Sequence, residues 1–282
     1  MSALEPQGPL VERLEAAADV VRSPCGDGDM VWHIWGDGPP IVLLHGGYGS
    51  WTHWAKNIDA LSVGRRVIAA DLPGLGDSAT APPPHYADEL VDILEAGIGP
   101  IGLADGRFDI AGFSFGAMLG GVLAARLGDR VGHYVMVGAA GLGAEPRTGP
   151  TLKRAPTAAS DEDYTALQRR NLGILMLSEG AEIDADTLGI HVANNRRARV
   201  RSRPLSRSTI LLGALPAIKA RLVGIWGEHD ITATPDLASR EAAIRQCRPD
   251  VDFHVITGAG HWVQYEAADR FNPLLLEALA RG

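Results

Sequence analysis

Residues 112–116 read GFSFG and place Ser114 between two glycines. The apolar run FDIA at 108–111 precedes this pentapeptide and apolar residues at helical spacing follow it, so the sequence predicts a strand, a tight turn and a helix. In such a turn the serine adopts a strained conformation that exposes its hydroxyl, and a side chain two residues away on either side would crowd the backbone. Gly112 and Gly116 meet that requirement. The alternative is a small-residue turn that merely contains a serine.

Short apolar runs recur on both sides of this turn and alternate with amphipathic stretches. These runs are MVWHIWG (30–36), IVLLHG (41–46), RVIAAD (66–71), HYVMVGAA (133–140), RLVGIWG (221–227) and VDFHVIT (251–257). The alternation predicts an α/β fold with a mainly parallel central sheet and helices on both of its faces. A last helix is expected over 267–279.

The pattern changes between about residues 141 and 216, where no buried-strand run occurs. The stretches 164–180 and 185–200 are amphipathic at helical spacing and are separated by turn residues. We therefore predict a core formed by residues 1–140 and 217–282, with a helical cap inserted at 141–216.

Composition limits the possible partners. The chain has 282 residues, of which 46% are hydrophobic, and a net charge of −8, which disfavours nucleic acid and anionic membrane surfaces. No segment has the apolar length of a signal peptide or a membrane span, so a cytoplasmic protein is expected, with homo-oligomers allowed. The two cysteines, Cys25 and Cys247, form neither a disulfide framework nor a metal-binding pattern, and we expect no metal or cofactor.

A nucleophilic serine needs a base, and nine histidines compete for that role. His261 follows the last predicted strand in the glycine-bearing loop TGAGHWVQY. Asp230 ends GIWGEHD just after another strand, so Ser114, Asp230 and His261 occur in the order expected of a catalytic triad in this architecture. Glu228 is the alternative carboxylate. Six other histidines are assigned to packed or edge positions (His33, His133, His254) or to solvated or pocket-lining positions (His53, His85, His191).

The negative oxygen of a tetrahedral intermediate needs hydrogen-bond donors. Two backbone N–H groups are candidates for this oxyanion hole. One belongs to Phe115, directly after the nucleophile at a helix N-terminus, and the other to Gly47 in LLHGGYG (43–49). The alternative is that residues 45–47 form only a turn, with His45 as a hydrogen-bonded structural residue.

Five motifs together resemble the serine-nucleophile branch of the α/β-hydrolase superfamily. They are LLHGG (43–47), DLPGLGDS (71–78), GFSFG (112–116), WGEHD (226–230) and GAGHW (258–262). The C-terminal stretch GHWVQYEAADRFNPLLLEAL (260–279) is most similar to the meta-cleavage-product hydrolases, which cleave carbon–carbon bonds in dienoates during aromatic degradation. This resemblance implies a cap over the site.

The same resemblance suggests residues of the substrate pocket. It implies Trp262, next to the base, as a pocket residue. That subfamily commonly has asparagine before its nucleophile and a cap arginine for the substrate carboxylate. Here Phe113 takes the first position, and an ungapped alignment from Ile183 puts His191 at the second. Together with Gly46, these residues are the candidates for the pocket.

Six arginines follow one another without an intervening acidic residue. A solvated helix face or salt bridges would explain them, and capture of a substrate carboxylate by one of them is the sharper alternative. They are Arg196, Arg197, Arg199, Arg201, Arg203 and Arg207.

The main functional hypothesis is a serine hydrolase that acts on a carboxylic ester or a related small-molecule acyl substrate through an acyl-enzyme. The alternative is carbon–carbon bond hydrolysis of a dienoate. An acyltransferase and a non-catalytic ligand-binding scaffold are the less favoured readings.

Overall fold

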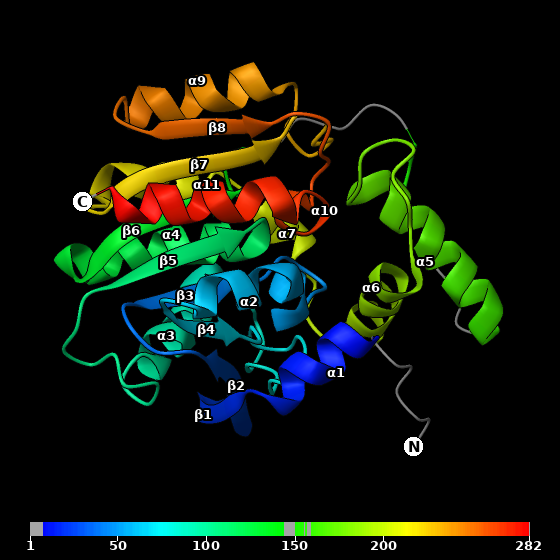
Figure 1. The fold of residues 1–282 in the computed structure, drawn as a ribbon, viewed down its shortest axis with the longest axis horizontal. Helices are drawn as coiled ribbons and strands as arrows, with labels where there is room; N and C mark the ends of the chain where they lie inside the picture. Colours follow the sequence, from blue (N-terminus) through cyan, green and yellow to red (C-terminus); the bar gives the residue numbers. More distant parts are fainter. Residues whose placement is uncertain (1–7, 144–149, 155, 157–158, 282) are drawn as a thin grey trace.

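A computed structural model describes residues 8–143, 150–154, 156 and 159–281, and it contains an eight-stranded sheet in the order β1-β2-β4-β3-β5-β6-β7-β8 (Figure 1). β1 and β2 pair antiparallel, as do β2 and β4, and all other neighbours are parallel. The strands are β1 (Asp19–Cys25), β2 (Gly28–Trp35), β3 (Pro40–Leu44), β4 (Arg66–Ala70), β5 (Phe108–Phe113), β6 (Val131–Val137), β7 (Arg221–Gly227) and β8 (Asp252–Ile256). The predicted α/β class with a mainly parallel sheet is confirmed.

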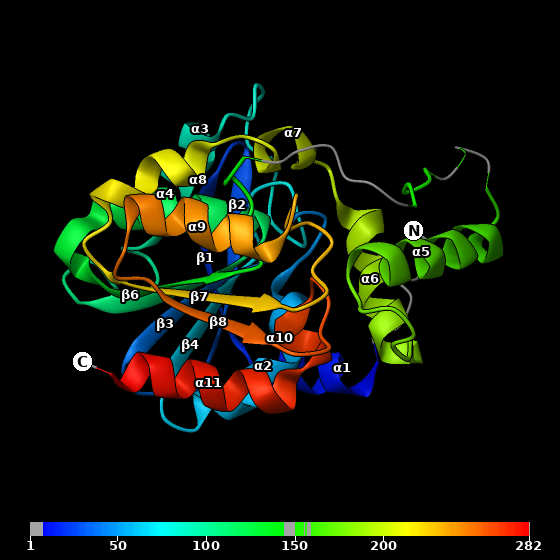
Figure 2. The ribbon, with the colours of Figure 1, turned by 90° about the horizontal axis from the view of Figure 1, so that it is seen from above.

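Helices cover both faces of the sheet (Figure 2). One face carries α3 (Ala87–Gly97), α4 (Phe115–Leu127), α8 (Ile210–Ala214) and α9 (Leu237–Cys247). The other carries α1 (Pro9–Ala16), α2 (Ala55–Ser62), α10 (Val263–Glu266) and α11 (Ala268–Ala280). The two hydrophobic cores lie between the sheet and these layers, as expected for strands buried on both faces. Single turns form η1 (Trp51–Trp54), η2 (Gly128–Arg130) and η3 (Leu215–Ala217).

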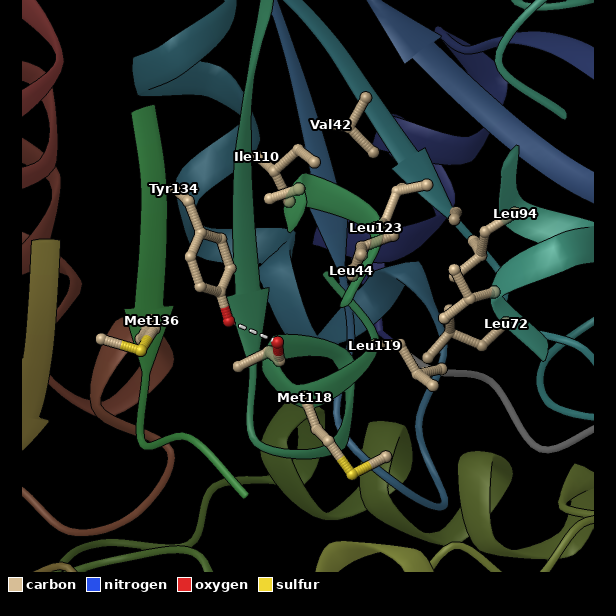
Figure 3. Close-up of a cluster of buried hydrophobic side chains, with 14 of the residues drawn as sticks. Val42, Leu44, Leu72, Leu94, Ile110, Met118, Leu119, Leu123, Tyr134 and Met136 are labelled. Carbon is tan, nitrogen blue, oxygen red and sulfur yellow. Dashed lines mark hydrogen bonds between the residues drawn. The ribbon is translucent and has the colours of Figure 1, made fainter. Parts of the chain in front are cut away.

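Helix α4 lies against the middle of the sheet, and its side chains show why GFSFG is followed by a helix. Met118, Leu119 and Leu123 are fully buried and belong to the same hydrophobic cluster as Ile110 of β5 (Figure 3). The buried hydroxyl of Tyr134 donates a hydrogen bond to the carbonyl oxygen of Ala117 on the same helix (Figure 3). The helix is therefore apolar on nearly all sides, as a central helix is.

The first turn of α4 crosses the end of β3 at very short range. A side chain at Gly116 would collide with the carbonyl oxygens of Leu44 and His45. Glycine allows this close approach of backbones. As a result, the loop that follows β3 is held next to the turn that carries Ser114.

The segment between β6 and β7 has two parts. Helices α5 (Asp161–Leu175) and α6 (Ala185–Arg197) lie beyond the carboxyl ends of the parallel strands (Figures 1 and 2). Short α7 (Arg203–Ser206) follows, and α8 then packs on α4 in the core. Ser160 and Asp184 cap α5 and α6 by accepting backbone N–H groups of the first turns.

The division into a core and a cap at 141–216 stays a prediction, and residues 1–7, 144–149, 155, 157–158 and 282 of those ranges lie outside the described residues. α5 ends at Leu175 rather than near 180, because the chain there turns towards the loop of His261. Strand β1 was not anticipated from the sequence. No helix among the described residues has both the length and the apolar character needed to cross a bilayer.

We predict that Gly116→Ala destabilises the fold by about 1–3 kcal/mol, because the added methyl group must displace backbone rather than a flexible side chain. Urea unfolding followed by circular dichroism measures this change. The matched control is Gly213→Ala in α8, where an added methyl group meets no atom within 4 Å. There we expect unchanged or slightly raised stability. Equal stability of the two variants would show that the helix start can move away from β3.

Candidate active site

Ser114 lies between β5 and α4 in a strained conformation, with φ 51° and ψ −111°. Its N–H donates to the carbonyl oxygen of Val137 (2.8 Å), and its own carbonyl oxygen accepts the N–H of Ala140 (3.1 Å). These bonds tie the turn to the end of β6. The residues on either side are buried and Ser114 is half-buried, so the turn presents its hydroxyl outward.

His261 and Asp230 form a connected line with this serine. Ser114 Oγ lies 3.1 Å from Nε2 of His261, and Nδ1 of the same ring lies 2.9 Å from Oδ2 of Asp230. The other oxygen of Asp230 accepts the N–H and the hydroxyl of Thr232, at 2.8 and 2.7 Å. His261 is 4% exposed and Asp230 is 5% exposed. This arrangement places a proton on Nδ1 and leaves Nε2 free to accept one from the serine.

The alternative carboxylate, Glu228, has a different partner. It accepts the N–H of Gly258 at 2.8 Å and lies on an exposed loop beside His229. It therefore orders the loop before His261 without touching the ring. The structure brings Asp230, and not Glu228, to the imidazole.

The candidate oxyanion donors lie on two sides of the serine. Phe115 is the first residue of α4, and Gly47 lies in the loop after β3, where an added Cβ would be 3.7 Å from Cβ of Phe115. Among the described residues, neither N–H donates to a protein acceptor. His45 is buried and hydrogen-bonded on both ring nitrogens, to Gly46 and Leu72. Residues 45–47 therefore combine both predicted features, a buried, hydrogen-bonded His45 and a Gly47 N–H without a protein acceptor among the described residues.

A cavity of about 390 Å³ opens above Ser114. Gly46, Gly47, Phe113 and His261 form its floor. Its walls come from the loops after β6 and β7 and from the β6–β7 insertion, with apolar contributions from Leu142, Leu152, Leu175, Met176 and Ile231 and charged ones from Arg203, Arg207 and Arg240. The volume suits a small organic molecule.

Two predicted pocket residues are not part of the lining of this cavity. Trp262 is fully buried, stacks on Tyr265 with ring centroids 4.0 Å apart, and donates Nε1–H to the carbonyl oxygen of His53. His191 is buried in α6 beside Asn195, and burial lowers its pKa to about 4. Trp262 therefore supports the loop of His261 from behind, and His191 carries no positive charge near neutral pH.

The six arginines divide into two groups. Arg196 and Arg197 pair with Asp161 and Asp77, and Arg199 donates to carbonyl oxygens of the 76–78 turn. Arg201, Arg203 and Arg207 are exposed and form no ion pair within the described ranges. Arg203 and Arg207 line the cavity.

Residues that sequence reasoning missed complete the site. Arg240 of α9 is buried and donates to the carbonyl oxygens of Leu142 and Gly143, which fixes the loop after β6. Its helical context gave no sign of this role. In the part of the chain that the structure describes, no three histidine, cysteine or acidic side chains converge as a metal site would require.

The chain matches sequence relatives along most of its length. It is 30% identical to the dihydrolipoyllysine-residue acetyltransferase component of the acetoin cleaving system of Pseudomonas putida, with 98% of this chain and 70% of the relative covered. It is 26% identical to the 2-hydroxy-6-oxo-6-phenylhexa-2,4-dienoate hydrolase of Burkholderia cepacia, with 88% and 90% covered.

Solved structures share the fold. A carboxylesterase from Bacillus subtilis (CesB) superposes with a TM-score of 0.76 at 18% identity, over 97% of this chain and 96% of that one. A meta-cleavage product hydrolase from Pseudomonas fluorescens (CumD) superposes with a TM-score of 0.72 at 24% identity, over 92% and 96%. Residues 41–274 match the sequence model of the alpha/beta hydrolase family. With these motifs, this sheet and this match, the chain belongs to the α/β hydrolase family.

Proposed function

We propose that the protein is a serine hydrolase in which Ser114 attacks the carbonyl carbon of an acyl substrate. The observation that carries this proposal is the unbroken line from Ser114 Oγ through His261 to Asp230 at the floor of a cavity. His261 accepts the serine proton as general base and then gives it to the leaving group. Asp230 orients the ring and stabilises its positively charged form.

The amides of Gly47 and Phe115 are proposed to hold the oxyanion. Phe115 directly follows Ser114, Gly47 lines the cavity, and neither N–H has another acceptor among the described residues. Donors that are fixed before the reaction stabilise developing charge without reorganisation. Water then enters through His261 and hydrolyses the acyl-enzyme.

We further propose that the substrate is a 6-oxo-dienoate whose carbon–carbon bond is hydrolysed. Two features support this class. The relatives include hydrolases named for 2-hydroxy-6-oxo-dienoates, from Burkholderia cepacia and Comamonas testosteroni. In addition, Arg203 and Arg207 put positive charge at the cavity without an ion-pair partner among the described residues, and a carboxylate there can be bound by charge-assisted hydrogen bonds.

The chemistry of this reaction suits the triad. In its 2-oxo tautomer the substrate has moved the proton of the 2-hydroxyl group to the carbon beside the 6-oxo carbon. The bond between these two carbons then breaks, the acyl part gains the hydroxyl of water, and the electron pair of the broken bond is delocalised over the conjugated 2-oxo group. The resulting enolate oxygen takes up a proton, which restores the 2-hydroxydienoate group. His261 is placed to supply that proton, since it has just taken one from Ser114.

Hydrolysis of a carboxylic ester is the second candidate. Two positions depart from the pattern of the meta-cleavage-product hydrolases. Phe113, an apolar residue, stands where that subfamily has asparagine, and it packs on His261 with ring centroids 4.8 Å apart. His191, which aligned with the cap arginine of that subfamily, is buried away from the cavity lining. An ester needs only a triad, an oxyanion hole and an apolar acyl pocket. Steady-state rates on a ring-fission dienoate and on short aryl esters separate the two candidates, and a preference for the dienoate is expected.

A serine-reactive phosphonate tests the nucleophile itself. We expect stoichiometric labelling of Ser114, seen by peptide mass spectrometry, and loss of both labelling and turnover in Ser114→Ala. Labelling of another residue, or turnover retained in that variant, would reject the mechanism for either substrate.

The carboxylate assignment gives a second prediction. Asp230→Asn should lower kcat about 10,000-fold, because the amide cannot hold the tautomer that the base requires. Glu228→Gln is the matched control on the same loop, and it should stay within about threefold of wild type because it does not touch the ring. A large loss in the control and a small one in Asp230→Asn would reverse the assignment.

The two arginines that line the cavity, Arg203 and Arg207, give a third prediction. The double variant Arg203→Gln, Arg207→Gln should raise KM for a dienoate about 10-fold to 100-fold, as expected when a charged hydrogen bond is lost. The kcat/KM for a neutral aryl ester should change by no more than about twofold. Arg201→Gln, which removes an exposed arginine outside the cavity lining, is the control. If dienoate and ester respond alike, these arginines do not recognise the carboxylate.

A further inference from the structure

Gly46 lies next to the proposed oxyanion residue and has both of its polar backbone groups bound by imidazole rings. Leu72 donates its N–H to Nε2 of His45 (2.9 Å), so this nitrogen is unprotonated and the proton is on Nδ1. Nδ1 then donates to the carbonyl oxygen of Gly46 (2.7 Å). On the other side, the N–H of Gly46 donates to Nδ1 of His53 (3.2 Å).

This pair of bonds determines where the next N–H points. The peptide bond between Gly46 and Gly47 is trans, and the carbonyl group and the N–H of a trans peptide point in opposite directions. His45 is fully buried and is not part of the cavity lining, so the carbonyl oxygen of Gly46 is directed into the protein. The N–H of Gly47 is thereby directed to the opposite side, where Gly47 lines the cavity.

The alternative orientation of this peptide would be harmful. Two adjacent glycines have little steric preference between φ regions, so the Gly46–Gly47 peptide could flip and present its carbonyl oxygen to the cavity. A carbonyl oxygen there would repel an oxyanion rather than donate to it. Bonds on both sides of Gly46 oppose the flip.

We propose that His53 is a positioning residue, whose Nδ1 acts with His45 to hold the Gly46–Gly47 peptide in the orientation that offers the N–H of Gly47 to the oxyanion. The inference rests on the proposed serine mechanism and adds to it a residue outside the triad. His53 acts through Gly46 and does not need to touch the substrate.

The surroundings of His53 support this role. Its ring packs edge-on against Phe113, at 5.5 Å between centroids, and Phe113 in turn packs on His261. The backbone carbonyl oxygen of His53 accepts Nε1–H of Trp262, the residue after the base. One residue therefore contacts the oxyanion loop, the residue before the nucleophile and the residue after the base.

The ring must be neutral for this role, because a protonated Nδ1 could not accept the N–H of Gly46. Burial, followed by the nearby imidazoles of His45, His191 and His261, lowers the pKa of His53 well below its usual value. His53 is 2% exposed, so water does not compete for its nitrogen. The acceptor form is therefore the stable one in the folded protein.

Two variants separate hydrogen bonding from packing. His53→Leu keeps bulk but removes the acceptor, and we expect kcat to fall about 10-fold to 100-fold with KM within about threefold, since a misplaced donor costs less than the 100-fold to 1,000-fold loss of an absent one. His53→Asn places an oxygen near the position of Nδ1 and should recover most of kcat. The control is His85→Leu, which alters a histidine on the 80–85 loop and should leave kcat and KM unchanged.

A second measurement does not depend on activity or on the folding of His53→Leu. In protein labelled with ¹⁵N-histidine, imidazole nitrogen shifts should show Nδ1 of His53 unprotonated and Nδ1 of His45 protonated. A protonated Nδ1 on His53 would overturn the inference. So would a kcat in His53→Asn as low as that of His53→Leu, or a kcat in His53→Leu equal to that of the wild type. Failure of the serine mechanism is seen separately, as absence of phosphonate labelling at Ser114 in the wild type.

Discussion

The backbone of Ser114 is the constraint around which the rest of the site is arranged. A non-glycine residue with φ 51° and ψ −111° is strained, and such strain persists only when its surroundings hold it. Here Val137 at the end of β6 accepts the N–H of the serine, Ala140 in the following loop donates to its carbonyl oxygen, and the buried helix α4 fixes the following residue. The backbone of Gly116, just after the turn, is nearly in contact with the end of β3. The loop of Gly46 and Gly47, which follows β3, therefore lies beside the serine hydroxyl.

The electrostatic design of the site follows from its burial. A buried carboxylate is costly unless its oxygens are bound, and Asp230 meets that condition with His261 on one oxygen and Thr232 on the other. The remaining nearby imidazoles serve as neutral hydrogen-bonding groups, because burial lowers the pKa of His45 and His53. The rings of His45 and His53 hold the backbone, whereas His261 is paired with Asp230, a carboxylate that can stabilise its charged form.

Sequence patterns anticipated the parts of the molecule that depend on local chemistry. The apolar runs identified seven of the eight strands, because strands buried on both faces are continuously apolar. β1 was missed because its sequence, DVVRSPC, is an exposed edge with polar residues and a proline. Ser114, Asp230 and His261 could be proposed from the sequence because Ser114 directly follows a strand and the other two lie in the loops after two further strands, and in a parallel sheet those ends meet.

The directions in which side chains point were harder to predict from the sequence than the strands and helices. Trp262 and His191 were assigned to the pocket by analogy, but whether a buried residue faces a cavity or the opposite side depends on packing between distant segments. His53 illustrates the reverse case, since nothing in the local sequence WTHW shows that its ring meets Gly46. Contacts between residues of one loop that folds back on itself leave no periodic pattern.

The segment between β6 and β7 is coupled to the loop of His261, and this coupling bears on how the cavity can change its shape. The N–H of Trp262 donates to the carbonyl oxygen of Met176, a cavity residue, at 2.6 Å, and Glu266 accepts the N–H groups of both Ser178 and Gly260. A side chain at Gly260 would collide with the backbone of this segment, so the two chains are in direct contact. A change in the insertion that reshapes the pocket therefore also acts on the loop of His261. Cavity residues away from this junction, such as Arg203 and Arg207, can be exchanged without disturbing the loop of His261.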